Sequence, residues 1–344
     1  MPPRITVVIP NWNGKRFLNR CLTSLHRQSF EDFETILVDN GSTDASVDFT
    51  ERNFPEVRVM PLGDNLGFSA AVNTGIRASE AEYVALLNND TETHPGWLEA
   101  LVHAAESYPQ VGFFASKLVD FNDRRLLDGA GDAFRRSGLP YRIGHGELDR
   151  GQFEREAFVF SACAAAALYR RAMLEDIGLF DEDFFSYCED GDVSFRAQLF
   201  GYQCLYVPGA VVYHLGSAST GGKRSATNTR LGTQNGLNLL VKNLPAALVW
   251  RSVPSLLGGQ LLRLMVTSFS GVLRAYLGGL AGAWRLLPLM LKKRKEIQNR
   301  RRVSDDYVRR LLRESSRKAT ESQRRRLRDQ IRLRLGRWIS RPAP

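Results

Sequence analysis

The segment Tyr83-Val84-Ala85-Leu86-Leu87-Asn88-Asn89-Asp90 carries the pattern that decides the fold, an apolar run that ends at two amides and a carboxylate. Five consecutive apolar residues predict a strand buried on both faces, as in a parallel sheet covered by helices. A strand that ends at a carboxylate offers a rigid position for a hard cation such as Mg²⁺ or Mn²⁺. The alternative is a polar turn before the helix that follows Pro95, because Asn and Asp favour such turns.

The same alternation of patterns runs through the first 115 residues. Apolar runs predict strands at residues 5–9, 35–38, 57–60, 83–87 and 111–115, and helical spacing falls near residues 17–25, 44–53, 68–78 and 96–107. This order predicts an α/β domain with a mostly parallel sheet and helices on both faces. Polar residues follow four of the strands, at Asn11 and Asn13, 39–42, 64–65 and 88–90. Ligands bind such sheets at the carboxyl ends of the strands, so we expect one crevice there.

A second acidic cluster, Glu189-Asp190-Gly191-Asp192, opens a helical pattern about a hundred residues further along the chain. The free amide groups and the dipole of a helix N-terminus favour ionised carboxylates, so this cluster offers a candidate base. Three carboxylates within four residues also repel one another, which favours a functional use over plain helix capping. One cluster to hold a metal-bound diphosphate and one to deprotonate an acceptor would suit sugar transfer from a nucleotide donor.

Three further positions allow either a structural or a ligand-binding interpretation. Asp39, at the start of the turn that leads to Asp44, could accept a hydrogen bond from a pyrimidine N3–H, while Asp44 is the expected helix N-cap. Gly67, in Asn65-Leu66-Gly67-Phe68, would let the backbone approach a ligand or would be an ordinary loop glycine. His214 follows the apolar run 205–213, and it would be a metal ligand only if it faced Asp90 across the crevice.

The charge of the chain is unevenly distributed. Residues 292–344 hold 20 Lys and Arg against 6 Asp and Glu, a balance of +14, whereas the other 291 residues hold 27 against 31, a balance of −4. This division disfavours a nucleic-acid-binding body and favours a tail that meets an anionic surface. Cys21, Cys163, Cys188 and Cys204 form no CxxC pair, which argues against structural zinc and a disulfide framework. The N-terminus runs straight into a strand-like segment, so we expect no signal peptide and a cytoplasmic location.

The segment 244–291 is apolar but is interrupted by arginines. Its longest uncharged stretch, Ser252 to Leu262, has 11 residues, short of the ~18–20 that span a bilayer. Arg263, Arg274 and Arg285 recur every 11 residues, which places them within about 40° on one helical face. We therefore expect an interfacial helix, or a pair broken near Pro254 and 278–279, with an oligomerisation hairpin as the alternative.

These patterns divide the chain into four parts. Residues 1–115 form the nucleotide-sugar half and 116–243 the acceptor half of one domain, followed by the interfacial segment 244–291 and a basic helical tail, 292–344. Five residues keep one apolar face on that tail: Leu327, Ile331, Leu335, Trp338 and Ile339. Polybasic attraction to anionic lipid would strengthen membrane contact by ~1 kcal/mol for each well-placed charge.

Six motifs together resemble the family 2 glycosyltransferases, and within them the rhamnosyltransferase-like members of bacterial cell-surface polysaccharide assembly. The motifs are Val7 to Gly14, Val38 to Asp44, Asn65 to Phe68, Leu87 to Asp90, Phe184 to Asp192 and Tyr213-His214. The resemblance covers about residues 4–240, in the order and spacing of the family. It implies a GT-A fold, a nucleotide-sugar donor carrying UDP or dTDP, a divalent metal (Mg²⁺ or Mn²⁺) and inversion at the anomeric carbon.

The resemblance also implies roles for individual residues. Asp39 would contact the base; Pro10 and Asn11 would line the pocket for the base and ribose, with Asn65, Gly67 and Asn89 completing the donor site. Asp90 would hold the metal, His214 would approach the metal or the diphosphate, and Asp190 would be the catalytic base, with Glu189 beside it. The chain departs from the common acidic form of the metal motif, because two of its three polar positions are Asn.

The expected activity is therefore inverting sugar transfer to a lipid-linked glycan acceptor, by an enzyme that lies peripherally on the inner face of the cell membrane. The alternative from another class is a catalytically idle scaffold that binds nucleotide sugar at the membrane surface. Nucleic-acid binding through the tail is disfavoured by the acidic body. A nucleotidyltransferase is disfavoured because no Gly-rich, basic phosphate loop lies near residue 10.

Overall fold

The structure, a computed structural model, describes residues 2–135, 140–216 and 225–339, with side chains up to residue 332. Its strands are β1 (Ile5–Asn11), β2 (Phe33–Asp39), β3 (Arg58–Pro61), β4 (Tyr83–Leu87), β5 (Thr91–Thr93), β6 (Val111–Asp120), β7 (Leu127–Ala130), β8 (Asp132–Phe134), β9 (Pro140–Arg142), β10 (Ala157–Val159), β11 (Ala166–Arg170) and β12 (Gln203–His214). Its helices are α1 (Lys15–His26), α2 (Ser46–Asn53), α3 (Phe68–Ala78), α4 (Trp97–Ser107), α5 (Arg171–Ile177), the short η1 (Glu182–Phe184), α6 (Glu189–Leu199), α7 (Ala226–Asn243), α8 (Ala246–Phe269), α9 (Leu273–Arg300) and α10 (Asp305–Ile339).

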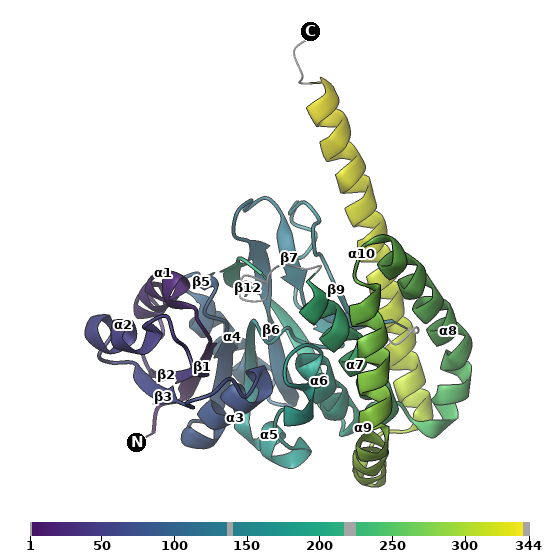
Figure 1. Cartoon of the computed structure of the whole chain (residues 1–344). Helices are drawn as coiled ribbons and strands as arrows, with labels where there is room; N and C mark the ends of the chain where they lie inside the picture. Colours follow the sequence, from purple (N-terminus) through teal and green to yellow (C-terminus); the bar gives the residue numbers. More distant parts are fainter. Residues whose placement is uncertain (1, 136–139, 217–224, 340–344) are drawn as a thin grey trace.

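One twisted sheet organises the N-terminal two thirds of the chain (Figure 1), and its strands follow the order β10-β12-β6-β11-β4-β1-β2-β3. β1 pairs in parallel with β2 and β4, and β2 with β3, as the repeated strand and helix patterns predict. β11 lies antiparallel between β4 and β6, and the short strands β10, β5 and β7 also pair antiparallel with β12 or β6. β11 comes from the apolar run 158–169, whose alanines fit closely between two buried neighbours. The mostly parallel sheet expected from the sequence is thus confirmed, as a mixed sheet with β11 inserted antiparallel in its centre and short antiparallel strands added to β6 and β12.

Two apolar cores lie on the two faces of this sheet. One face packs against α1 and α4 around the fully buried Trp97, and the other against α3, α5 and α6 around Phe195. Alternate residues of β4 supply both cores, Val84 and Leu86 to one and Ala85 and Leu87 to the other. A strand that is apolar at every position is therefore required here, because neither face of it meets water.

The C-terminal helices pack more closely against the rest of the protein than was expected of a basic tail. α9 crosses the expected boundary at residue 291 and packs along α7. The first part of α10 lies against the β8–β9 region, and Val308, Leu312 and Ala319 are buried in the same core as Phe195. Three buried polar side chains of α10 accept hydrogen bonds from backbone N–H groups of the body: Ser315 from Phe134, Ser322 from Gly144 and Asp329 from Leu148. Residues 305–329 therefore form part of the folded unit.

The arginine spacing in the segment 244–291 gave a wrong expectation. The chain turns at residues 270–272, so Arg263 lies on α8 while Arg274 and Arg285 lie on α9. Pro254 and Gly278-Gly279, expected to break the helix, lie inside α8 and α9. Arg263 points into the large cavity of the protein, whereas Arg274 and Arg285 are exposed. The physical reason is that an 11-residue repeat defines one face only along an unbroken helix.

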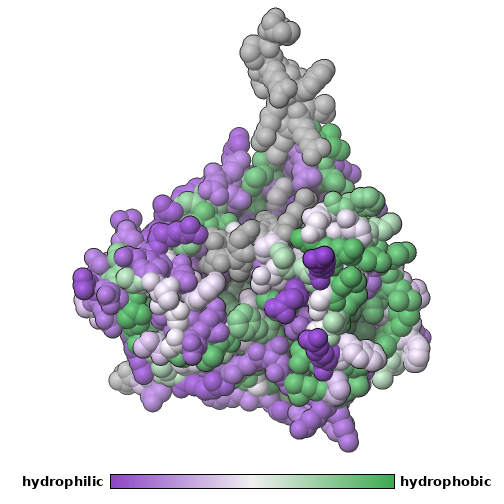
Figure 2. Space-filling view, viewed as in Figure 1, coloured by the Kyte–Doolittle hydropathy of each residue, from purple (hydrophilic) through white to green (hydrophobic). Residues whose placement is uncertain are grey.

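The outer face of α8 is apolar. Trp250 and Phe269 are 81% and 92% exposed, and Leu257, Leu261 and Met265 share this surface. Figure 2 shows an extended apolar area over this side of the molecule. Of the apolar face expected on the tail, Leu327 and Ile331 are exposed, while Leu335, Trp338 and Ile339 lie outside the residues whose side chains are described. Within the described ranges, none of the helices combines the length and apolar character needed to span a bilayer.

Candidate active site

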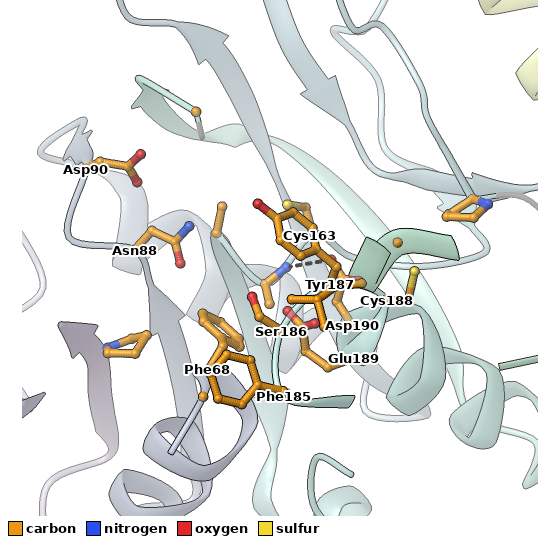
Figure 3. A pocket seen from close by; sticks show the side chains of 18 of the residues that line it. Phe68, Asn88, Asp90, Cys163, Phe185, Ser186, Tyr187, Cys188, Glu189 and Asp190 are labelled. Carbon is orange, nitrogen blue, oxygen red and sulfur yellow. Dashed lines mark hydrogen bonds between the residues drawn. The ribbon is translucent and has the colours of Figure 1, made fainter. Parts of the chain in front are cut away.

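A cavity of about 1150 Å³ lies at the carboxyl ends of the strands, and both acidic clusters line it. Figure 3 shows Asp90 on one side of this cavity and Glu189 and Asp190 on the other. Nine of the ten site residues named from the sequence are on its wall: Pro10, Asn11, Asn65, Gly67, Asn89, Asp90, Glu189, Asp190 and His214. The tenth, Asp39, lies behind the wall, where its carboxylate accepts hydrogen bonds from Asn11 Nδ2 at 2.9 Å and from the backbone N–H of Ser42 at 2.9 Å.

Amide side chains tie the ends of β1, β2 and β4 to the loop after β3. Asn11 Nδ2 donates to Asp39, while Asn11 Oδ1 accepts from Asn89 Nδ2 at 2.7 Å. Asn40 Nδ2 donates to Asn65 Oδ1 at 3.0 Å and to the Gly67 carbonyl at 3.1 Å. These bonds orient neutral polar groups at the strand ends, so this half of the cavity is a fixed hydrogen-bonding surface with little charge.

Gly67 is required by packing within the protein. Its φ is +90°, and an added Cβ would lie 2.6 Å from Cδ2 of Phe185. The Phe185 carbonyl also accepts a hydrogen bond from the Ser69 N–H at 3.2 Å. The glycine therefore permits the loop before α6 to lie against the start of α3, in addition to lining the cavity.

His214 faces Asp90, as a metal ligand at this position would have to. His214 Nε2 is buried, has no hydrogen-bond partner among the described residues and lies 3.4 Å from Asp90 Oδ1. His214 Nδ1 donates to Asp128 Oδ2 at 2.7 Å. Burial would lower the pKa of His214, but the hydrogen bond to Asp128 and the nearby Asp90 carboxylate outweigh it and raise the pKa to about 9.

This arrangement fits a divalent metal. A separation of 3.4 Å between two donor atoms is compatible with one ion that has bonds of about 2.1 Å. A metal-binding histidine usually donates its other ring N–H to a carboxylate, which is the position of Asp128. Asn89 uses its amide nitrogen to bond Asn11, and this bond does not engage its Oδ1, the atom that could meet a metal.

A buried ionic cluster lies on the side of the cavity that carries Asp190. Arg142 donates to Asp128 Oδ2 at 3.0 Å and to Cys163 Sγ at 2.7 Å, and its Nε lies 3.5 Å from Asp132 Oδ1. Potential ligand atoms of Asp132, Cys163 and Asp190 lie within 4.8 Å of one another. The guanidinium of Arg142 already supplies the positive charge beside this group, so the cluster needs no metal. Burial, with the Asp190 and Asp128 carboxylates adding to it against Arg142, raises the pKa of Asp132 to about 7.

Asp190 and Glu189 are in the first turn of α6 and have few partners. Asp190 accepts hydrogen bonds from the backbone N–H groups of Gly191 at 2.7 Å and Ala164 at 3.4 Å. Burial raises the pKa of Asp190 despite the nearby Arg142. Glu189 Oε2 has no hydrogen-bond partner in the described structure, and burial together with the charge of Asp190 raises the pKa of Glu189 to about 8. Burial thus outweighs the helix dipole that the sequence analysis emphasised.

The loop before α6 has a strained backbone. Phe185, Tyr187 and Cys188 have positive φ values of 58°, 73° and 67°, which non-glycine residues adopt at a cost of about 1–3 kcal/mol each. Asn235 of α7 is fully buried and holds this loop. Its Nδ2 donates to the carbonyls of Phe184 at 2.7 Å, Ser186 at 2.9 Å and Tyr187 at 2.9 Å. A buried amide therefore fixes the conformation that presents Glu189 and Asp190 to the cavity.

Asp192, the third carboxylate of the cluster, points away from the cavity. Arg196 Nε, Lys242 Nζ and Asn243 Nδ2 donate to it at 2.9, 2.8 and 2.8 Å. Burial would raise the pKa of Asp192, but Lys242 and Arg196 lower it to about 2. Asp192, which was not among the named site residues, thus serves packing inside the protein, because cations on its own side compensate its charge.

Sequence reasoning missed four residues of the site. Asp128, Asp132 and Arg142 come from the short strands β7 to β9, and Asn235 comes from α7. A signal was present for the first two, because Leu127-Asp128-Gly129-Ala130-Gly131-Asp132 places carboxylates among small and apolar residues. No local pattern distinguishes Arg142 or Asn235, since each acts through partners distant in the sequence.

Comparison with known proteins agrees with this geometry. The family model "Glycosyl transferase family 2" matches residues 6–178. The chain belongs to glycosyl transferase family 2. The glycosyltransferase is 30% identical over 241 residues to N-acetylglucosaminyl-diphospho-decaprenol L-rhamnosyltransferase of Mycobacterium tuberculosis, with 63% of this chain and 78% of the relative covered. It is 33% identical over 217 residues to the pre-mycofactocin glycosyltransferase of the same species, where the match covers 61% of this chain but only 42% of the relative.

Solved structures agree on the fold. The glycosyltransferase is similar to GalNAc-T7 with UDP, GalNAc and Mn²⁺, with a TM-score of 0.57, 16% identity, and coverage of 70% of this chain and 48% of that one. It is also similar to the mannosyltransferase PcManGT from Pyrobaculum calidifontis in complex with GDP-Man and Mn²⁺, with a TM-score of 0.52, 17% identity, and coverage of 87% and 86%. The expected GT-A fold is confirmed.

Proposed function

We propose that this glycosyltransferase moves a sugar, with inversion at the anomeric carbon, from a UDP- or dTDP-linked donor to a lipid-linked glycan acceptor in cell-surface polysaccharide synthesis. The observation that carries the proposal is that Asp90 and Asp190, far apart in the sequence, line the same cavity. The mycobacterial relative, whose name specifies a diphospho-decaprenol acceptor and rhamnosyl transfer, supports the substrate class.

The donor occupies the half of the cavity that is lined by amides. The nucleotide contacts the lining residues Pro10, Asn11, Asn65, Gly67 and Asn89. Asp39 acts on the base either directly, after a small movement of its side chain, or indirectly through Asn11, which donates a hydrogen bond to it. Asp90 and His214 hold Mg²⁺ or Mn²⁺, with Asp128 fixing the orientation of the imidazole. When bound, the metal neutralises charge that develops on the departing diphosphate.

Asp190 takes the proton of the acceptor hydroxyl. The acceptor oxygen forms a bond to the anomeric carbon while the bond from that carbon to the diphosphate oxygen breaks, and the bonding electrons leave with the diphosphate. Burial supports this role, because a carboxylate whose pKa is raised is a stronger base. Glu189, with a pKa of about 8, keeps its proton at neutral pH and can donate a hydrogen bond to the acceptor without adding a second negative charge.

The enzyme lies peripherally on the inner face of the cell membrane, with the outer face of α8 against the lipid. The exposure of Trp250, Leu261 and Phe269 supports this placement, because soluble surfaces rarely gather large apolar side chains. Sedimentation with phosphatidylglycerol vesicles tests it. The double variant Leu261→Glu, Phe269→Glu should stay in solution, whereas Phe158→Glu, at an exposed apolar position on β10, should sediment like the wild type. Sedimentation of the double variant would contradict the placement.

Calorimetry of UDP and dTDP binding, with and without Mn²⁺, tests the donor site. Wild-type protein should bind one of the two nucleotides more tightly when Mn²⁺ is present. Asp90→Ala should lose this Mn²⁺ dependence, because the variant lacks a hard oxygen ligand beside His214. Asp48→Ala, which removes an exposed carboxylate of α2, is the control and should behave as wild type. If Asp90→Ala keeps the full response to Mn²⁺, the metal site is elsewhere.

A further inference from the structure

The guanidinium of Arg263 is a cation at the acceptor end of the cavity. The side chain is half-buried and lines the cavity, and no hydrogen bond or ion pair joins its guanidinium to another residue in the described ranges. Burial lowers the pKa of its guanidinium, and the nearest ionisable groups are the Cys188 thiol and the Tyr276 hydroxyl. An arginine that is partly desolvated and lacks a carboxylate partner is poorly compensated in the free protein, and a bound anion would supply the missing charge.

The position of Arg263 separates it from the donor's metal site. Cys188, its neighbour, directly precedes Glu189 and Asp190 in the chain. In Figure 3, Asp90 and Cys188 lie at opposite sides of the cavity, with Glu189 and Asp190 between them. An anion at Arg263 would therefore lie beyond the proposed base, on the side from which the acceptor approaches, while the donor's diphosphate belongs to the side of Asp90.

The helix that carries Arg263, α8, is polar on its inner face and apolar on its outer face. Its inner face carries Arg263, Gln260 and Thr267, while Leu261, Met265 and Phe269 on its outer face are exposed. One helix thus separates the cavity from an apolar surface. A ligand with an anionic group and a long apolar chain matches both faces, with the anion inside and the chain passing α8 to the lipid.

We propose that Arg263 binds the diphosphate of a polyprenyl-diphosphate-linked acceptor and so places the acceptor sugar at Asp190. This inference rests on the proposed function and adds the group that recognises the acceptor. A guanidinium suits the role because its fork of N–H donors matches two phosphate oxygens. The open space beside Gly232, where an added Cβ would meet nothing within 4 Å, leaves room for such a group next to α7.

Binding of geranyl diphosphate to the full chain tests this inference, with geraniol as the uncharged comparison. Wild type should bind geranyl diphosphate more tightly than geraniol. Arg263→Gln should weaken diphosphate binding by at least about tenfold, and Arg263→Lys should weaken it less, because the charge remains but the fork is lost. Arg274→Gln, an exposed arginine on α9, is the matched control and should bind as wild type.

Mn²⁺-dependent binding of UDP and dTDP to the same variants separates the two possible diphosphates. Arg263→Gln should bind the nucleotide as wild type does. If it instead loses nucleotide affinity, Arg263 serves the donor and the inference is wrong. The inference is also wrong if wild type does not bind geranyl diphosphate, or if Arg263→Gln binds it unchanged. Failure of the wild type to bind any nucleotide would overturn the proposed function itself, whatever Arg263 does.

Discussion

Two carboxylates of α6, Asp190 and Asp192, lie on different faces of the helix and in opposite environments. On the cavity face, Asp190 accepts hydrogen bonds only from backbone N–H groups and its pKa is raised by burial. Two residues later, Asp192 is bonded to Lys242 and Arg196, and its pKa falls to about 2. The difference shows that proximity in sequence does not give acidic residues a common role. Partners from other elements decide which carboxylate can accept a proton and which one stabilises the fold.

The sharpest test of this comparison is Asp190→Asn. Transfer should fall by about 10²–10⁴-fold, because the variant lacks the group that takes the acceptor proton. The thermal midpoint should change little, since the side chain has no charged partner to lose other than the nearby Arg142. Transfer assays with a lipid-linked acceptor and thermal melts on the same preparation measure both effects. Full turnover by Asp190→Asn would contradict the proposed base, whereas nucleotide binding without transfer by the wild type would favour the interpretation as an idle scaffold.

Asp192→Asn should show the reverse pattern. Removing one partner of a buried ion network typically costs about 3–5 kcal/mol of folding free energy, because Lys242 is left buried with less compensation. Urea unfolding measures this loss, and Asp48→Asn, which breaks an exposed pair with Arg52, should cost less than about 1 kcal/mol. If Asp192→Asn costs less folding free energy than Asp48→Asn, Asp192 does not stabilise the fold.

The same carboxylate predicts how stability depends on pH. Because the folded pKa of Asp192 lies below its ordinary value of 3.8, its contribution is complete above that value and is lost as the pH falls toward 2. The wild type should therefore lose stability more steeply than Asp192→Asn below about pH 4. If the wild type and Asp192→Asn lose stability equally as the pH falls, groups other than Asp192 cause the acid sensitivity.

The smallest effect is expected from Asn235 of α7, which holds the loop before α6. Asn235→Ala should cost about 1–3 kcal/mol, because three loop carbonyls lose a shared donor. It should also lower kcat more than it raises the donor KM, because the relaxed loop misplaces Asp190 but leaves the nucleotide half intact. Asn238→Ala is the matched control on the same helix, since the Nδ2 atom of Asn238 is buried and has no hydrogen-bond partner in the part of the chain that the structure describes. Equal effects of both variants would contradict a positioning role for Asn235.

Sequence patterns predicted residues 1–115 well and residues 116–243 poorly. In the first half each strand ends at its own polar residues, so local periodicity places Asn11, Asn65 and Asp90 at one edge. β11 could not be placed in the same way, because an alanine-rich run does not specify its direction or its neighbours. Arg142 and Asn235 act only across long sequence separations, through partners on other elements. The face that Arg263 was expected to share with Arg274 and Arg285 does not exist, because the chain turns at Ser270-Gly271, where Gly271 has a φ of +74° and the arginine spacing was followed across this helix-ending glycine.

The hydrogen bonds between α10 and the body limit how this enzyme can be shortened. Backbone N–H groups of Phe134, Gly144 and Leu148 have their acceptors on α10, and these residues flank the strands that carry Asp132 and Arg142. A fragment cut to the stretch that the family model matches, residues 6–178, would lack Asp190 and His214 as well as those acceptors. The proposed catalytic centre and the C-terminal helix are therefore one module, and a transplant of sugar-transfer activity to another scaffold would have to carry both.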